Sequence, residues 1–191
     1  MKGCDDRDEW LMARAAHGER DALEPLVRRH ATRLLTFLER MVGDRHRAEE
    51  LFQEVFLAVW AKRRQYEFPR PFRPWLYAIA ANKCHAAARG RRPAAVALDD
   101  AAPWAPAATV PSPEESAVAT ETAALVAAAV TLLPPQQRAV VVLRVWQGLS
   151  YAQIARVVGC NEATARSHMH HGLAALRSHL EPRLGVTRER D

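Results

Sequence analysis

The side chains that could do chemistry in this sequence favour binding over catalysis. No paired carboxylates, no nucleophile beside a base and no glycine-rich phosphate loop stand out along the 191 residues. We therefore expect a protein that is not an enzyme and that acts through its surfaces.

Histidine and cysteine are the candidate metal ligands. His168 and His171 lie three residues apart, so one helical face could present both, but no third ligand has obvious reach. The cysteines are odd in number and widely spaced, which fits neither a disulfide framework nor a zinc motif. We expect reduced thiols, no metal and no cofactor. The cysteines are Cys4, Cys84 and Cys160.

A DNA-reading chemistry is indicated by SYAQIARVVGCNEATARSHMHH, residues 150–171. Ser150 and Gln153 have the spacing of a capping box, and Gly159 suits a tight corner. Asn161 can then cap a second helix. An ordinary helical hairpin has a similar corner, but the combination of cap, corner and cap favours a helix-turn-helix.

The helices of this motif need one face for the core and one for a partner. The residues expected inside are Ile154, Ala155 and Val158 before the corner, and Ala165, Met169, Leu173, Leu176 and Leu180 after it. The start of a recognition helix is the part that reaches base edges in the major groove. The outward residues there are Glu162, Ala163, Arg166, Ser167 and His170.

Another candidate binding surface lies on the helix predicted for HRAEELFQEVFLAVWAK, residues 46–62. Its apolar residues form a broad stripe for the core: Leu51, Phe52, Val55, Phe56, Val59 and Trp60. Its other face carries a row at spacings of three and four: Glu50, Gln53, Glu54 and Leu57. This row could bind a partner helix, and a solvated charged face fits the pattern equally well.

A further candidate binding surface lies in the segment that follows, YEFPRPFRPWLYAIAANKCHAAARGRR, residues 66–92. Prolines stiffen a loop between the rings of Tyr66, Phe68 and Phe72, which could line a pocket. The next helix has a polar, basic side made of Asn82, Lys83, Arg89, Arg91 and Arg92, and an inner side made of Trp75, Leu76 and Ile79. Rings beside cations suit single-stranded DNA, because exposed bases stack on rings while cations hold phosphates. The alternative is that the rings are core and the arginines cover them.

Helical periodicity dominates the sequence, and no segment alternates like a half-buried strand. We expect an all-α protein of two small helical domains. The domains span residues 1–92 and 116–182, joined by a proline- and alanine-rich linker at 93–115 and followed by a tail at 183–191.

Charge and hydropathy limit the partners and the compartment. The net charge of +5 and the pI near 9.6 suit a polyanion such as nucleic acid, and a solvated basic surface with no partner would give the same total. No apolar run is long enough to cross a bilayer, and the N-terminus lacks the order of a secretory signal. We expect a cytoplasmic protein with no membrane insertion.

Taken together, these motifs resemble the extracytoplasmic-function (ECF) sigma factors, promoter-specificity subunits of bacterial RNA polymerase. The similar segments are LMARAAHGERDALEPLVRRH, AEELFQEVFLAVW, FRPWLYAIAANKCHAAARGRR, and the stretch from LPPQQR to LRSHL. They follow one another in the family's order around the proline-rich tether, and they cover almost the whole chain.

The resemblance implies roles and partners. Glu50, Gln53, Glu54 and Leu57 would bind the clamp helices of the largest subunit of core RNA polymerase, and the second domain would meet the flap of the second-largest subunit. The loop from Tyr66 to Phe72, with Phe68, would hold a base flipped out of the minus-ten element, beside Asn82, Lys83 and Arg89. Glu162, Ala163, Arg166, Ser167 and His170 would face the minus-thirty-five duplex of promoter DNA. An anti-sigma factor is a further implied partner.

Three features of the sequence depart from the family pattern. His168 and His171 stand where arginine is frequent, so phosphate attraction there is weaker near neutral pH. Gln153 replaces the usual glutamate, and Ala86 replaces a common aspartate.

Two rival functions remain at this stage. A free-standing helix-turn-helix regulator would use only the second domain, normally as a dimer. A sigma-like interaction protein would instead titrate a partner.

Overall fold

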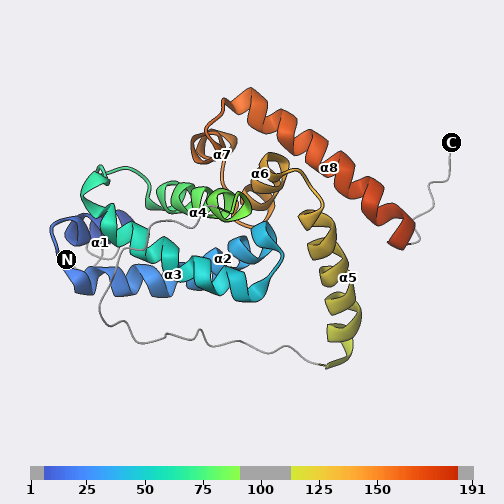
Figure 1. The fold of residues 1–191 in the computed structure, drawn as a ribbon, viewed down its shortest axis with the longest axis horizontal. Helices are drawn as coiled ribbons and strands as arrows, with labels where there is room; N and C mark the ends of the chain where they lie inside the picture. The colour runs from blue at the N-terminus through green and yellow to red at the C-terminus, as the bar shows by residue number, and fades with distance from the viewer. Residues whose placement is uncertain (1–6, 91–112, 185–191) are drawn as a thin grey trace. The chain divides into compact units, whose positions relative to one another are not determined.

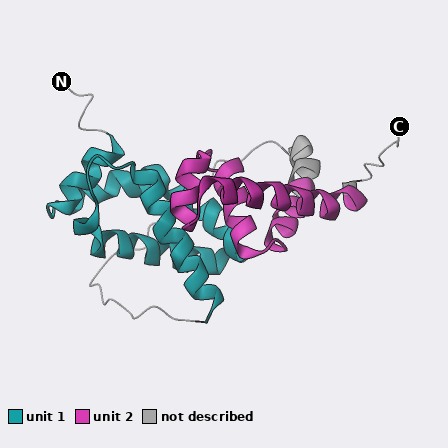
Figure 2. Ribbon diagram, turned by 90° about the horizontal axis from the view of Figure 1, so that it is seen from above, with its two compact units in different colours: residues 1–106 teal, residues 107–191 magenta. Residues whose placement is uncertain are grey.

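The computed structural model describes residues 7–90 and 113–184, with backbone alone for 113–121 and 184, and every regular element in those ranges is helical (Figure 1). The expected all-α class is therefore confirmed. Cys4, Arg91, Arg92, and most of the predicted linker and tail lie outside the described residues. The chain divides into two compact units, residues 1–106 and 107–191 (Figure 2).

Unit 1 is a helical bundle in which α2 packs on α3 and both contact α4. Its elements are α1 (Asp8–Ala16), a 3₁₀ turn η1 (Arg20–Ala22), α2 (Leu23–Val42), α3 (Arg45–Ala61), a second 3₁₀ turn η2 (Arg63–Gln65) and α4 (Phe72–Ala88). The core is apolar and fully buried, and its largest side chains include Leu26, Leu34, Phe37, Leu38, Leu51, Leu76 and Tyr77.

The sharp turn between α2 and α3 has a local cause. Gly43 ends α2 with φ +74°, a left-handed conformation that costs glycine little. Asp44 follows as the cap of α3, because its Oδ1 accepts the Arg47 N–H at 2.6 Å. Two residues thus reverse the chain and place α3 against α2.

Helix α1 is hydrogen-bonded both to α2 and to the start of α4. The His30 ring, which is buried on α2, bonds Asp8 Oδ2 through Nε2 at 2.7 Å, and Arg29 pairs with Asp8 at 3.1 Å. One residue further on, Glu9 Oε1 accepts the backbone N–H of Phe72 at 3.3 Å. Since α4 has no side-chain cap of its own, α1 supplies the acceptor for that first N–H.

Unit 2 is built around its last helix, which packs on the other three. Its elements are α5 (Pro113–Thr131), α6 (Pro135–Val145), α7 (Tyr151–Val158) and α8 (Glu162–Leu184). Helix α5 begins at Pro113, so the last three residues of the predicted linker, 113–115, are helical. Pro135 begins α6 at a position where the missing N–H costs nothing.

The predicted caps of the helix-turn-helix are present. Gln153 N donates to Ser150 Oγ at 3.2 Å, and Gln153 Oε1 accepts the Ser150 N–H at 2.9 Å, which completes the capping box. Gly159 turns the corner with φ +72°, and Asn161 Oδ1 accepts the Thr164 N–H at 2.7 Å.

The inward stripe of this motif differs from the prediction at three positions. Leu173 was expected inside and is 45% exposed, because Gly172 faces α6 instead and is itself buried. Likewise Val157, rather than Val158, is buried on α7, and Leu180 is only half-buried. The missing side chain of Gly172 lets α8 lie close to α6, which rotates Leu173 toward solvent.

Candidate polymerase and nucleic-acid interfaces

The predicted polymerase-binding row on α3 is solvent-accessible, but unevenly so. Glu50 and Gln53 are exposed, and Leu57 is 36% exposed. The side chain of Glu54 is only 26% exposed, which corrects the expectation of a fully outward carboxylate. The row therefore presents two polar residues and one apolar residue, with Glu54 at its edge.

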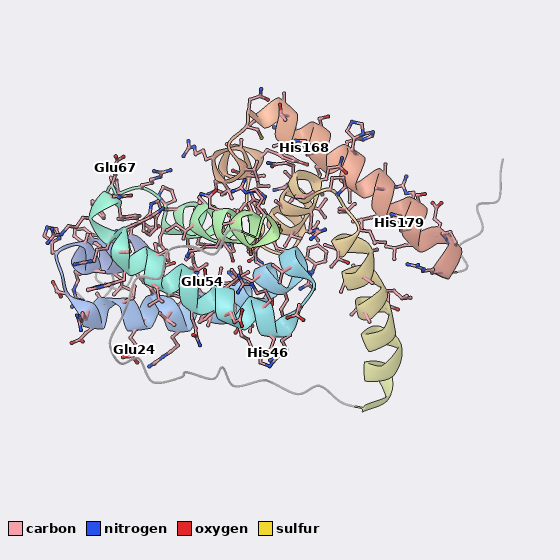
Figure 3. All side chains as sticks on the ribbon, in the orientation of Figure 1. Glu24, His46, Glu54, Glu67, His168 and His179 are labelled. Carbon is pink, nitrogen blue, oxygen red and sulfur yellow. The ribbon has the colours of Figure 1, made fainter. Side chains whose placement is uncertain are left out.

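Glu54 is held by cations from two helices. Glu54 lies on α3 (Figure 3). Lys83 Nζ on α4 lies 3.1 Å from Glu54 Oε2, and Arg47 on α3 lies 3.8 Å from Glu54 Oε1 and also bonds Glu50. A partly buried pair of this kind is more stabilising than an exposed one, because solvent screens it less. A residue predicted to bind polymerase and one predicted to bind DNA are thus joined to each other.

The aromatic loop before α4 is mostly part of the core. Tyr66 is 7% exposed and Phe72 is fully buried, whereas Phe68 is 46% exposed. The Tyr66 ring lies 5.3 Å from the Trp75 ring and 6.4 Å from the Phe72 ring, and its hydroxyl donates to Arg70 O. Burial, together with the nearby acids of α1, raises the pKa of Tyr66. The prediction that Tyr66 and Phe72 offer open rings to a base is wrong, because these rings pack on each other and on Trp75.

The exposed ring of this loop has a partner that the sequence did not reveal. Trp10 on α1 is 38% exposed, and its ring centroid lies 4.8 Å from that of Phe68. Fifty-eight positions separate the two residues in the sequence, so no local pattern could pair them. Among residues 7–90, Phe68 and Trp10 are therefore the aromatic side chains classed as exposed, while Phe52 and Trp60 are half-buried.

The polar side of α4 agrees in part with its predicted role. Asn82 and Arg89 are exposed, and Lys83 is 21% exposed and ion-paired with Glu54. His85 lies on the same helix, and partial burial together with the charge of Arg89 lowers its pKa. Trp75, Leu76 and Ile79 are buried, as expected for the inner side.

The predicted recognition row opens α8. All five of its residues are exposed: Glu162, Ala163, Arg166, Ser167 and His170. Their accessibility meets the requirement for reading a groove, and their contact with DNA stays a prediction. Arg166 Nη2 pairs with Glu162 Oε2 at 3.3 Å, one helical turn earlier.

One residue outside the predicted row, Tyr151, contacts its arginine, and it also contacts a second arginine on α6. The Arg166 Cζ lies 4.5 Å from the centroid of the Tyr151 ring on α7, and Arg144 Cζ on α6 lies 5.0 Å from the same ring. Arg144 also donates to Leu149 O at 2.9 Å. The sequence indicated this cluster only through Tyr151, an aromatic residue that directly follows the Ser150 cap at the start of α7.

The histidines of α8 do not assemble a metal site. His170 and His171 have ring centroids 5.6 Å apart, and His168 is half-buried. Among the side chains described at residues 7–90 and 122–183, no three histidine, cysteine or acidic groups gather closely enough to hold an ion. Across residues 7–90 and 113–184, no helix has both the length and the apolar character that a membrane span requires.

Comparison with known proteins defines the class of both units. Residues 26–93 match the family described as Sigma-70 region 2, and residues 123–176 match Sigma-70, region 4. A helical two-unit chain with both regions in this order is a sigma factor, a transcription initiation factor.

Full-length relatives place the chain more closely. The RNA polymerase sigma-H factor of Pseudomonas aeruginosa is 32% identical over 94% of this chain and 96% of its own length. The ECF RNA polymerase sigma factor SigL of Mycobacterium tuberculosis is 32% identical over 91% of this chain and 97% of its own. The solved structure of CnrH in complex with the cytosolic domain of CnrY matches with a TM-score of 0.70, at 26% identity over 92% of this chain and 97% of that one. The chain belongs to the ECF sigma factor family.

Proposed function

We propose that this sigma factor binds core RNA polymerase and directs initiation at a bipartite promoter, with residues 1–92 serving the minus-ten element and residues 116–182 the minus-thirty-five element. Residues 93–115 would tether the two domains. The observation that carries the proposal is the presence on one chain of both sigma regions, each with an exposed polar helical face on α3 or α8. Nucleotide joining would belong to the polymerase.

In this proposal α3 supplies the contact with the polymerase clamp helices. Gln53, Leu57 and Glu50 form its accessible part, and one apolar side chain among polar ones is typical of the rim of a protein interface. The second domain would meet the flap of the second-largest subunit.

Strand opening would use the surface of α4 and the loop before it. Phe68 offers an exposed ring for an unstacked base, while Asn82 and Arg89 face solvent further along the helix that follows. Unstacking a base costs a few kcal/mol, so contacts to the extruded base make opening depend on sequence. Tyr66 and Phe72 would act indirectly, by holding the loop in place.

Upstream recognition would use the first turns of α8. Arginine can donate two hydrogen bonds to guanine in the major groove, so Arg166 is the residue proposed to discriminate most strongly. Ser167 and His170 would contribute further polar contacts, and Ala163 and Glu162 border them.

An anti-sigma factor is the further partner proposed. The support is that CnrH, whose chain matches at 26% identity, was solved as a complex with the cytosolic domain of CnrY. To test this partner, the purified chain is used to recover binding proteins from cells of its source. A specific protein should be recovered, and peptides that bind the sigma factor should abolish its recovery by competition.

The main experiment adds the purified chain to core polymerase and a promoter-containing template pool. Transcripts that start at defined sites only when the chain is present support the proposal. A gel shift of duplex DNA without polymerase would instead support a free-standing regulator, and neither result would support a protein that titrates a partner.

The polymerase contact can be tested at Gln53, since replacing Glu54 would also remove its bond to Lys83. Gln53→Arg should weaken binding to core polymerase about 10-fold or more, because it places a cation in the interface. Thr32→Arg is the matched control, because it adds the same charge at an exposed position of α2. Equal core affinity of the two variants would contradict the assignment of α3.

A further inference from the structure

The Tyr151 ring on α7 contacts guanidinium groups from the helix before it, α6, and the helix after it, α8. Arg166 on α8 and Arg144 on α6 have Cζ atoms 4.5 and 5.0 Å from the ring centroid, both within the range of a cation–π interaction. Glu162 holds the same Arg166 by an ion pair of 3.3 Å. The side chain of Arg166 is thus restrained on an otherwise exposed surface.

Restraint matters because a free arginine has many rotamers. Arginine side chains carry about 2 kcal/mol of rotamer entropy, and binding must overcome the part that is lost. A guanidinium already held against a ring and a carboxylate loses less on binding, which is preorganisation in its ordinary sense. The planar fork must also be oriented correctly to donate two bonds to one base.

The anchoring of the ring is itself well defined. Tyr151 is half-buried at the first position of α7, directly after the Ser150 capping box. Arg144 is fixed from the other side, because its Nη1 donates to Leu149 O at 2.9 Å in the turn before α7. The ring therefore has a fixed backbone position and two cationic neighbours.

We infer that Tyr151 is a positioning residue that holds the Arg166 guanidinium in the orientation that reads the upstream promoter element. This inference rests on the proposed function of α8, and it adds a specificity determinant on α7. Tyr151 need not touch a base for this role, because it acts through Arg166.

The experiment uses holoenzyme and a duplex library randomised over the upstream element, with bound sequences counted after selection. Arg166→Ala should relax base preference at one position. Tyr151→Leu should relax the preference at that same position about 2- to 5-fold, the range expected for loss of an exposed cation–π contact. The double variant should show no further relaxation than Arg166→Ala alone, because both changes remove one unit of recognition.

Tyr151→Phe is the matched control, since it keeps the ring and removes only the hydroxyl, and it should retain the wild-type preference. If Tyr151→Leu does not fold, Tyr151→Met offers a flexible apolar replacement with the same expected readout. An equal loss of affinity for every sequence, or relaxation that adds to that of Arg166→Ala, would overturn the inference. If wild-type holoenzyme selects no upstream sequence at all, the proposed function of α8 fails instead.

Discussion

Replacing Gly172 tests how closely α8 packs on α6. A Cβ at this position would lie 2.7 Å from Val141 Cγ2 and 3.6 Å from Gln137 Cβ. Carbon atoms in contact are normally about 3.5–4.0 Å apart, so Val141 would have to move by roughly 1 Å. Val141 is fully buried and β-branched, which leaves its methyl group little freedom.

The expected magnitude follows from two opposing terms. Alanine is favoured over glycine inside a helix by about 1 kcal/mol, whereas overpacking a core costs about 1–3 kcal/mol. We expect Gly172→Ala to lower the free energy of unfolding of unit 2 by about 1 kcal/mol. Ala174→Gly, at an exposed site of the same helix, measures the propensity term by itself.

The assay is amide hydrogen exchange of unit 2 across a urea series, because a chain of two units need not unfold in one step. Val141→Ala opens space for the new methyl group. Gly172→Ala should therefore be less destabilising, or stabilising, in a Val141→Ala background. A gain of about 1 kcal/mol for Gly172→Ala in the wild-type background would refute the close approach of the two helices.

Three further changes test other parts of the fold. The hydrogen bond from His30, followed by its charge and by Arg29, lowers the pKa of Asp8 below its ordinary value of 3.8 despite partial burial. The stabilisation from this carboxylate is therefore complete above pH 3.8 and is lost as pH falls through the lowered pKa. The difference in free energy of unfolding between wild type and Asp8→Asn, measured by urea unfolding, should therefore shrink in that acid range. Asn161→Ala removes the acceptor of the Thr164 N–H and should cost unit 2 about 1 kcal/mol by urea unfolding; no loss would contradict the cap. Leu173→Gln should change the free energy of unfolding of unit 2 little, because Leu173 is 45% exposed. Truncating a buried leucine costs about 2–5 kcal/mol, and a loss of that size would mean that Leu173 is buried, as the sequence predicted.

Local signals predicted the parts of the fold that depend on neighbours in sequence. Ser150, Gln153, Gly159 and Asn161 were assigned correctly, because caps and left-handed corners are set within a few residues. The periodic stripe on α3 was recovered in part. Leu51, Val55, Phe56 and Val59 are buried, whereas Phe52 and Trp60 are half-buried.

The errors arose where tertiary packing decides. Tyr66 and Phe72 have side chains equally suited to a core or a pocket, and only the position of Trp75 places them inside. The link between Lys83 and Glu54 joins residues 29 positions apart on different helices. Gly172 was overlooked because an absent side chain gives no hydrophobic signal.

The hydrogen bond from Phe72 N to Glu9 bears on where the first domain can be cut. Residues that match Sigma-70 region 2 start at position 26, beyond α1. A fragment trimmed to that boundary would leave the opening amide of α4 exposed to water and the buried His30 ring without its carboxylate partner. A fragment that keeps both contacts must therefore begin at or before Asp8, upstream of the sequence signature.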